Sequence, residues 1–428
     1  MSAFVCVILN VITLVICHHV HKKFYYPVVI LNLMWLFVNL LNIILVWNSN
    51  EFEYMILALP PLMFSIGFFI GEKTRVKIKN DDGYLNSFEP YQLNPIVAWL
   101  ALGIIAIIFM FYAYFFISRI GLYSAFNRWY ALRRIVWEED INEAIIYRYG
   151  VIPAFLLPSV FLISAQRSRK KVEWLGFIIA LFIAIVWSIL RTSRTSTLNV
   201  VMLMVMSQIL LINAKAKSYT DTKKAKRRTR RLFICGGIFI LILFLYVALQ
   251  KNENSYGEVS RSMFFLKSIS NYTNLSSAAF VEWYKTGFIS TKGENTFRFI
   301  IAVLSRLGIG NKQAIANSGG LYVSYAGLTT NAMTVARAYV EDYGVWFMAM
   351  MLMIFGMIHG TIYRITEKSS GIKKIRYALI NAMLYIPLFY QILTNQYMNV
   401  LSAWLQYVIW IIVFTSPNAW KQTRYRNE

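Results

Sequence analysis

The residues best suited to acid–base chemistry in this chain are an arginine and a glutamate late in the sequence. Arg337 and Glu341 are four positions apart, and Thr330 and Thr334 precede them at helical spacing. As one helix, 330–341 would place all four side chains on a polar stripe suited to lining a wet cavity. A carboxylate there can accept a proton, and a guanidinium can stabilise negative charge. The alternative is a surface ion pair, although arginine before glutamate is the weaker order.

Two other arginine groups suit an anion such as a phosphate. Arg191 and Arg194 lie in the short connector 191–196, whose hydroxyl residues can cap the next helix, so that guanidiniums and free backbone N–H groups converge. Ordinary capping, with arginines that reach the membrane interface, is the alternative. Arg298 and Arg306 bound an apolar segment too short to span a bilayer. We expect that segment to pack on the membrane face or on the top of the helix bundle.

No motif for a metal ion, a nucleotide or an activated serine is present. Zinc spacings, Walker motifs and nucleophile-elbow patterns are missing, and the three cysteines lie in apolar runs without a ligand pattern. The acidic triplet 138–140 points three ways on a helix, which makes it a weak cation site. We therefore predict no metal and no other cofactor. Asp342, beside Glu341, is expected to cap the following helix.

Composition identifies an integral membrane protein. Of 428 residues, 58% are hydrophobic, and the mean hydropathy is +0.51, more than a soluble core requires. The sequence predicts an all-α membrane protein of about eleven transmembrane helices with one large extracytoplasmic loop lobe. The expected spans are 2–17, 26–47, 53–71, 96–117, 149–165, 173–190, 197–213, 232–249, 344–362, 377–393 and 398–415.

Basic residues set the expected orientation. The run 223–231 is the most basic connector and should be cytoplasmic, which places the N-terminus outside and the C-terminus inside. The net charge of +23 then reflects membrane orientation, and no nucleic-acid partner is expected. The predicted outer connectors hold 11 Arg but 5 Lys. Arginine's rigid fork suits phosphate oxygens, although small numbers can give such a bias by chance.

This topology divides the chain into three parts. Residues 1–249 form a bundle of eight predicted spans, 250–343 form the extracytoplasmic loop that we expect to be catalytic, and 344–428 carry three spans. The predicted spans hold no ionisable residue at depth, which argues against an ion-coupled transporter. The outer connector 119–148 mixes arginines with aromatic residues. We favour a membrane-surface anchor there over a catalytic role.

Several short features together resemble a known family. They are the many spans, one large external loop late in the chain, Ser193-Arg194-Thr195 at the start of a span, and Thr330-Asn331 followed by Arg337 and Glu341-Asp342-Tyr343-Gly344. In these features the chain resembles Wzy-type oligosaccharide repeat-unit polymerases. The resemblance implies a bacterial inner-membrane glycosyltransferase with a GT-C-like layout. Such an enzyme joins undecaprenyl-diphosphate-linked repeat units into O-antigen or capsular polysaccharide at the periplasmic face.

For such a reaction we assign roles to the arginines and the glutamate. Arg191 and Arg194 would bind the diphosphate with help from Arg298 or Arg306, while Arg337 and Glu341 act at the reacting sugar. The expected partners are membrane lipids, the lipid-linked oligosaccharide and, by the resemblance alone, a separate chain-length regulator.

Two other functions stay open. One is an O-antigen ligase. Ligases of that type use a histidine on the outer side, whereas every histidine in this chain falls on the predicted cytoplasmic side, which argues against this function. The other is a flippase for lipid-linked sugars, which the uncharged spans and the large loop lobe argue against.

Overall fold

The computed structural model shows a helical membrane protein. It describes residues 2–21, 23–45, 50–74, 91–93, 95–121, 145–168, 170–191, 194–213, part of 227–238, 270, 273–309, 323–325, 328–416 and 420–422. Within these residues, 8 stretches are long and apolar enough to cross a membrane. They are α1 (Ser2–His21), α2 (Pro27–Ile44), η1 (Phe52–Ala58) with α3 (Leu59–Lys73), α4 (Pro95–Ile120), α7 (Ile145–Ser168), α8 (Lys171–Leu190), α9 (Arg194–Asn213) and α15 (Val345–Lys368). The predicted all-α membrane class is confirmed, whereas the extracytoplasmic loop lobe stays a prediction.

The other predicted spans differ in length and composition. α16 (Gly371–Tyr390) begins with several basic residues and contains Pro387. The predicted last span is divided into α17 (Gln396–Asn399) and α18 (Leu401–Phe414). With 14 residues, α18 is shorter than the roughly 20 that a bilayer normally requires. Because the predicted span 232–249 lies mostly outside the described residues, the count of eleven stays a prediction.

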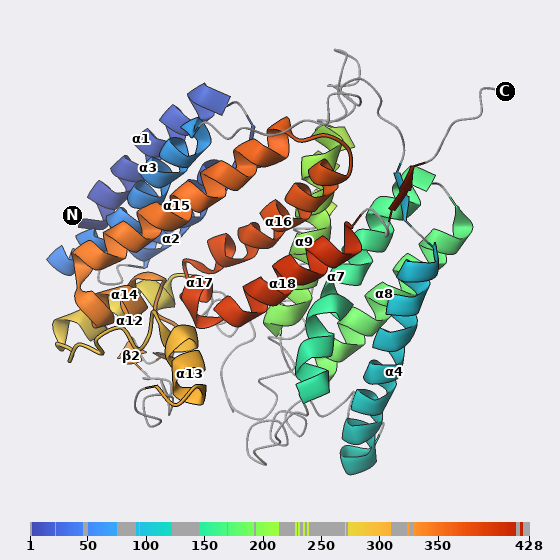
Figure 1. The fold of residues 1–428 in the computed structure, drawn as a ribbon. Coiled ribbons are helices and arrows are strands. Elements are labelled where there is room, and N and C mark those ends of the chain that lie inside the picture. Colours follow the sequence, from blue (N-terminus) through green and yellow to red (C-terminus); the bar gives the residue numbers. More distant parts are fainter. Residues whose placement is uncertain are drawn as a thin grey trace. The chain divides into compact units, whose positions relative to one another are not determined.

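The contacts divide the chain into two compact units, whereas our three-part division follows membrane topology. Unit 1 comprises Met1–Val76, Val259–Arg364 and Leu384–Ser402, and unit 2 comprises Lys77–Glu258, Ile365–Met383 and Ala403–Glu428. Besides its spans, unit 1 holds α12 (Leu275–Lys285), α13 (Arg298–Arg306), β2 (Val323–Tyr325), β3 (Leu328–Thr330) and α14 (Ala336–Tyr343) (Figure 1).

Among the described residues, each unit contains one short antiparallel strand pair. In unit 1, β2 pairs with β3 so that Val323 lies opposite Thr330. In unit 2, β1 (Tyr91–Leu93) pairs with β4 (Trp420–Gln422), with Tyr91 opposite Gln422. These strands have three residues each, so the helices carry the architecture.

Glycines bring α3 and α15 into backbone contact within unit 1. A Cβ atom added at Gly67 would lie 1.9 Å from the Met353 carbonyl oxygen, and one at Gly360 would lie 2.1 Å from the Phe68 carbonyl oxygen. Gly71 and Gly356 make equally close approaches, so each helix contributes two glycines four positions apart. Small residues at this spacing are a common means of helix association in membranes, where close backbone packing replaces the hydrophobic effect.

We expect Gly356→Ala to destabilise the protein by about 1–3 kcal/mol, the usual effect of overpacking. The new methyl group would lie 2.1 Å from the Phe64 carbonyl oxygen and would separate the two helices. Gly103→Ala is the matched control, because no atom lies within 4 Å of a Cβ at that position of α4. Unfolding of the purified protein by denaturing detergent compares the two. Equal stability of both variants would contradict the close packing.

Polar side chains attach α12 to the end of α2. The Asn42 amide donates to the Ser277 hydroxyl at 2.6 Å, and the Asn274 amide donates to the Asn42 side-chain oxygen at 3.1 Å. Lys285, at the other end of α12, forms an ion pair with Glu51 at 3.2 Å. Figure 1 shows α12, α13 and α14 gathered at one end of α15. The loop helices therefore lie at the end of unit 1 where α2 continues into η1.

Candidate active site on α14

The structure corrects the predicted polar stripe. A single helix from Thr330 is wrong, because Thr330 ends β3 and α14 begins only at Ala336. The Thr330 hydroxyl accepts a hydrogen bond from the Ala332 N–H at 3.0 Å, and the Thr334 hydroxyl accepts one from the Ala336 N–H at 3.3 Å. These are the local bonds that draw threonine into turns and helix starts. Only the last two residues of the stripe keep helical spacing.

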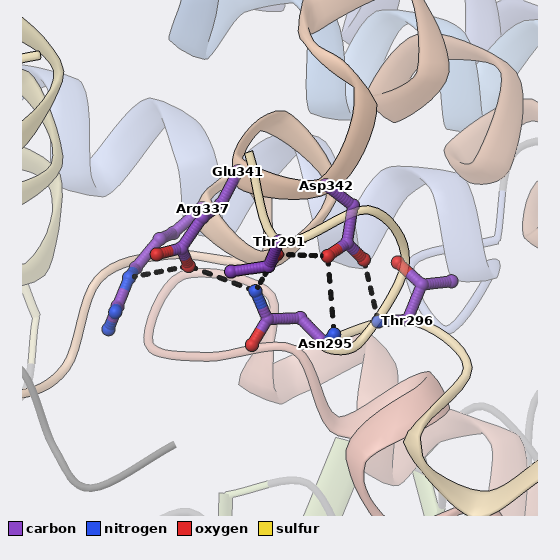
Figure 2. Close-up of polar contacts among 6 residues, drawn as sticks. All are labelled: Thr291, Asn295, Thr296, Arg337, Glu341 and Asp342. Carbon is purple, nitrogen blue, oxygen red and sulfur yellow. Dashed lines mark hydrogen bonds and ion pairs between the residues drawn. The ribbon is translucent and has the colours of Figure 1, made fainter. Parts of the chain in front are cut away.

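Those two residues, Arg337 and Glu341, form an ion pair on α14. The Arg337 Nε atom lies 3.4 Å from the Glu341 Oε2 atom, and the side chains are 23% and 15% exposed (Figure 2). The same Oε2 atom accepts a hydrogen bond from the Asn295 amide at 3.0 Å. The Arg337 guanidinium also lies 5.7 Å from the centre of the Trp283 ring, a cation–π distance. The carboxylate is thus held by two groups while part of it stays exposed.

The environment of Glu341 suits a proton acceptor. Burial raises the pKa of this carboxyl group above its usual value, although Arg337 and the Asn295 amide oppose the rise and Asp342 adds to it. A carboxylate with a raised pKa is a stronger base, and such shifts gather at catalytic positions. Glu341 therefore combines partial exposure, fixed orientation and increased basicity.

Asp342 has a structural role that differs from the predicted one. Its carboxylate does not cap α15 but accepts hydrogen bonds from the Thr291 hydroxyl, from the Asn295 N–H at 3.2 Å and from the Thr296 N–H at 2.7 Å (Figure 2). Asp342 is fully buried. Its charge therefore binds the loop 290–296 to α14, and that loop delivers the Asn295 side chain to Glu341.

Two further hydrogen bonds, both accepted by backbone carbonyl oxygens, reinforce this loop. The Thr291 N–H donates to the Glu341 carbonyl oxygen at 3.1 Å, and the Tyr343 hydroxyl donates to the Lys292 carbonyl oxygen at 2.8 Å. At the end of α14, Gly344 has a φ of 85°, a left-handed conformation that glycine adopts without strain. This residue allows α15 to begin at Val345 directly. Glu341 consequently lies within one helical turn of a membrane span.

Buried contacts fix the opposite face of α14. The Tyr339 hydroxyl donates to the Asn395 side-chain oxygen at 3.0 Å, and the Val335 N–H donates to the Gln391 carbonyl oxygen at 2.8 Å. Asn395 also caps α17 through the N–H groups of that helix. The connector between α16 and α18 thereby fixes α14 on the face opposite Arg337 and Glu341. Sequence reasoning missed Asn295, Asn395 and Gln391, because no local pattern links them to α14.

The predicted phosphate-binding arginines lie on two different units. Arg298 and Arg306 are the first and last residues of α13 in unit 1, and both are exposed. Arg191 follows α8 and Arg194 begins α9, both in unit 2. The connector is shorter than predicted, because Thr195 and Ser196 already belong to α9. The convergence of all four guanidiniums stays a prediction.

The remaining sequence candidates are outside the described residues. The acidic triplet 138–140 and most of the connector 119–148 fall there. Among the residues that the structure does describe, no three His, Cys, Asp or Glu side chains gather as a metal site would require. Comparisons with protein-family models, with curated proteins and with solved structures found no match.

Proposed function

We propose that this membrane protein is a glycosyltransferase that polymerises undecaprenyl-diphosphate-linked oligosaccharide units at the periplasmic face of a bacterial inner membrane. The product would be O-antigen or capsular polysaccharide. The observation that carries the proposal is the Arg337–Glu341 pair on a short helix next to a membrane span. That place suits a substrate whose diphosphate stays near the bilayer surface while its sugars extend into water. The orientation in this proposal, with the N-terminus periplasmic and the C-terminus cytoplasmic, follows the charge distribution.

The proposed reaction exchanges one glycosidic bond for another. An acceptor sugar hydroxyl loses its proton to Glu341, and its oxygen forms a bond to the anomeric carbon of the donor sugar. The bond between that carbon and the diphosphate oxygen breaks, and the lipid diphosphate leaves with the bonding electrons. Arg337 stabilises negative charge near the reacting sugars. Its position over Trp283 helps to keep the guanidinium in place.

Arg191 and Arg194 would bind the leaving diphosphate, with Arg298 or Arg306 in support. Arginine can donate two parallel hydrogen bonds to phosphate oxygens, whereas lysine offers a point charge. The N-terminus of α9 beside Arg194 adds about 0.3–1 kcal/mol of anion stabilisation.

We expect Arg191→Lys and Arg194→Lys each to lower the polymerisation rate about tenfold, which corresponds to about 1.4 kcal/mol. Lysine keeps the positive charge but cannot donate two parallel hydrogen bonds to phosphate oxygens. Arg119→Lys, at the end of α4, is the matched control and should keep the parent rate, because Arg119 lies over the Phe115 ring. Initial rates at several substrate concentrations provide the comparison. Parent rates in both lysine variants would exclude bidentate phosphate binding at these positions.

We also expect activity to survive a strong metal chelator. Guanidinium groups can supply the positive charge that a metal ion brings to other diphosphate reactions. The measurement is the rate of chain growth before and after chelation. Loss of activity that magnesium or manganese restores would instead favour a cation site at the acidic triplet 138–140.

One reconstitution experiment separates the candidate functions. Purified protein in liposomes receives a fluorescent lipid-linked repeat unit and, separately, a lipid A-core acceptor. A polymerase produces a ladder of longer glycans, a ligase adds glycan to the core, and a flippase moves the labelled lipid across the bilayer unchanged. His359 is a poor candidate for a ligase's outer histidine, since it is buried within α15 beside the Tyr397 hydroxyl. We expect the ladder.

A further inference from the structure

α13 presents an apolar stripe to its surroundings. Ile300, Val303 and Leu304 of the helix, with Leu307 directly after its end, follow the spacing i, i+3, i+4, i+7, and they are 44%, 41%, 38% and 70% exposed. Ser305, on the opposite side of the helix, is buried. A helix on a water-facing loop normally buries its apolar side. α13 is turned the other way, so its stripe needs an apolar environment outside the folded unit.

Aromatic contacts fix the level at which α13 begins. The Phe297 ring, just before the helix, lies 6.4 Å from the Phe347 ring in the first turn of α15. The Tyr343 ring lies 4.9 Å from the same ring. Trp346, in that turn, is 84% exposed, and exposed tryptophans are typical of the membrane–water interface. α13 therefore starts where a membrane span enters the bilayer.

The charges of α13 match a lipid surface. Arg298 and Arg306 are exposed at its two ends, and the helix Arg298–Arg306 contains no acidic residue. At helical spacing both arginines point away from the centre of the apolar stripe. Guanidiniums above an apolar face suit phosphate headgroups above acyl chains.

We infer that α13 is an interfacial membrane helix whose stripe of Ile300, Val303, Leu304 and Leu307 is buried among the phospholipids around the N-terminal end of α15. The inference rests on the chain being a membrane protein and does not depend on the proposed activity. Its consequence is positional. The segment before α13 is bound to Asp342 through the Asn295 and Thr296 N–H groups. A lipid-embedded α13 thus fixes the height of α14 and of Glu341 above the bilayer.

Spin labels on the full chain in phosphatidylethanolamine and phosphatidylglycerol liposomes test this inference. Single cysteines at 300, 303, 304 and 307 carry the label in a background with Cys235→Ser, since Cys235 is exposed whereas the other two cysteines are buried. Labels at the exposed Thr286 and at the exposed Glu294 are the controls. Collision rates with oxygen, which concentrates in lipid, are compared with those of a water-soluble nickel chelate.

At the four stripe positions we expect the collision rate with oxygen to exceed that with the nickel chelate. At the two control positions we expect the reverse. A higher collision rate with the nickel chelate than with oxygen at the stripe would mean that α13 lies in water, and it would overturn the inference. Protection of the stripe from both reagents would also overturn it, because the face would then be covered by protein, either another segment of this chain or a second copy. Neither result would bear on Glu341 as the base, so this inference and the proposed function can fail separately.

Discussion

Glu341→Gln is expected to lower polymerisation by about 10²–10⁴-fold, the usual contribution of a general base, while the protein stays folded. Glutamine keeps the size of the side chain and an oxygen that can accept the hydrogen bond from Asn295. It cannot accept a proton from the acceptor sugar. Glu294→Gln is the matched control, because Glu294 is exposed on the adjacent loop and should tolerate the same change. Full activity of the Glu341 variant at normal expression would remove Glu341 as the base.

The direction of the pKa shift adds a pH test. Because burial raises the pKa of Glu341 above the ordinary 4.5, activity should fall at a correspondingly higher pH as the carboxylate becomes protonated. The same shift favours the neutral carboxyl group in the folded state. Its contribution to stability is therefore complete below the ordinary pKa and is lost as pH rises through the folded pKa. At neutral pH we expect Glu341→Gln to unfold no more easily than the parent protein.

Asp342→Asn is the second substitution with a large expected effect. The new amide would place a donor where the Asp342 Oδ2 atom accepts from the Thr296 N–H, and the charge that strengthens all three bonds to the loop would be lost. We expect a loss of about 1.5–3 kcal/mol in the free energy of unfolding, because the site is buried. Release of the loop would also withdraw Asn295 from Glu341 and lower activity.

Asn295→Ala separates these two effects. It removes the amide that contacts Glu341 but keeps the backbone N–H that Asp342 binds. We expect lower activity with a smaller loss of stability than in Asp342→Asn. Thermal unfolding and initial rates measured on both variants provide the comparison. If the two variants are equally stable, the Asp342 carboxylate does not hold the loop.

Features that depend on contiguous residues were predictable from sequence. A membrane span is a continuous apolar run. Hydropathy therefore predicted the all-α class and the positions of the eight described stretches that are long and apolar enough to cross a membrane. The Arg337–Glu341 pair was predictable because side chains four apart meet on one face of a helix. Gly67 and Gly71 on α3, with Gly356 and Gly360 on α15, carried a readable spacing that sequence reasoning missed.

Features that depend on distant residues were not predictable. Asp342 and Thr296 are 46 positions apart, and no local pattern links a carboxylate to backbone N–H groups at that distance. The predicted helix from Thr330 was wrong because the spacing of polar residues does not show strand pairing, and pairing with β2 places Thr330 in a strand. A local polar pattern suggested one stripe, but the tertiary contacts of Val335 and Tyr339 decide where α14 begins and which way it faces.

The stoichiometry of lipid diphosphate release distinguishes polymerisation from transport. Purified protein in liposomes receives a defined amount of lipid-linked repeat unit, and free undecaprenyl diphosphate and new glycosidic bonds are counted by mass spectrometry. We expect one lipid diphosphate to be released for each bond formed, and both products to be lost together in Glu341→Gln. Lipid-linked units that cross the bilayer with no bond formed and no diphosphate released would contradict it.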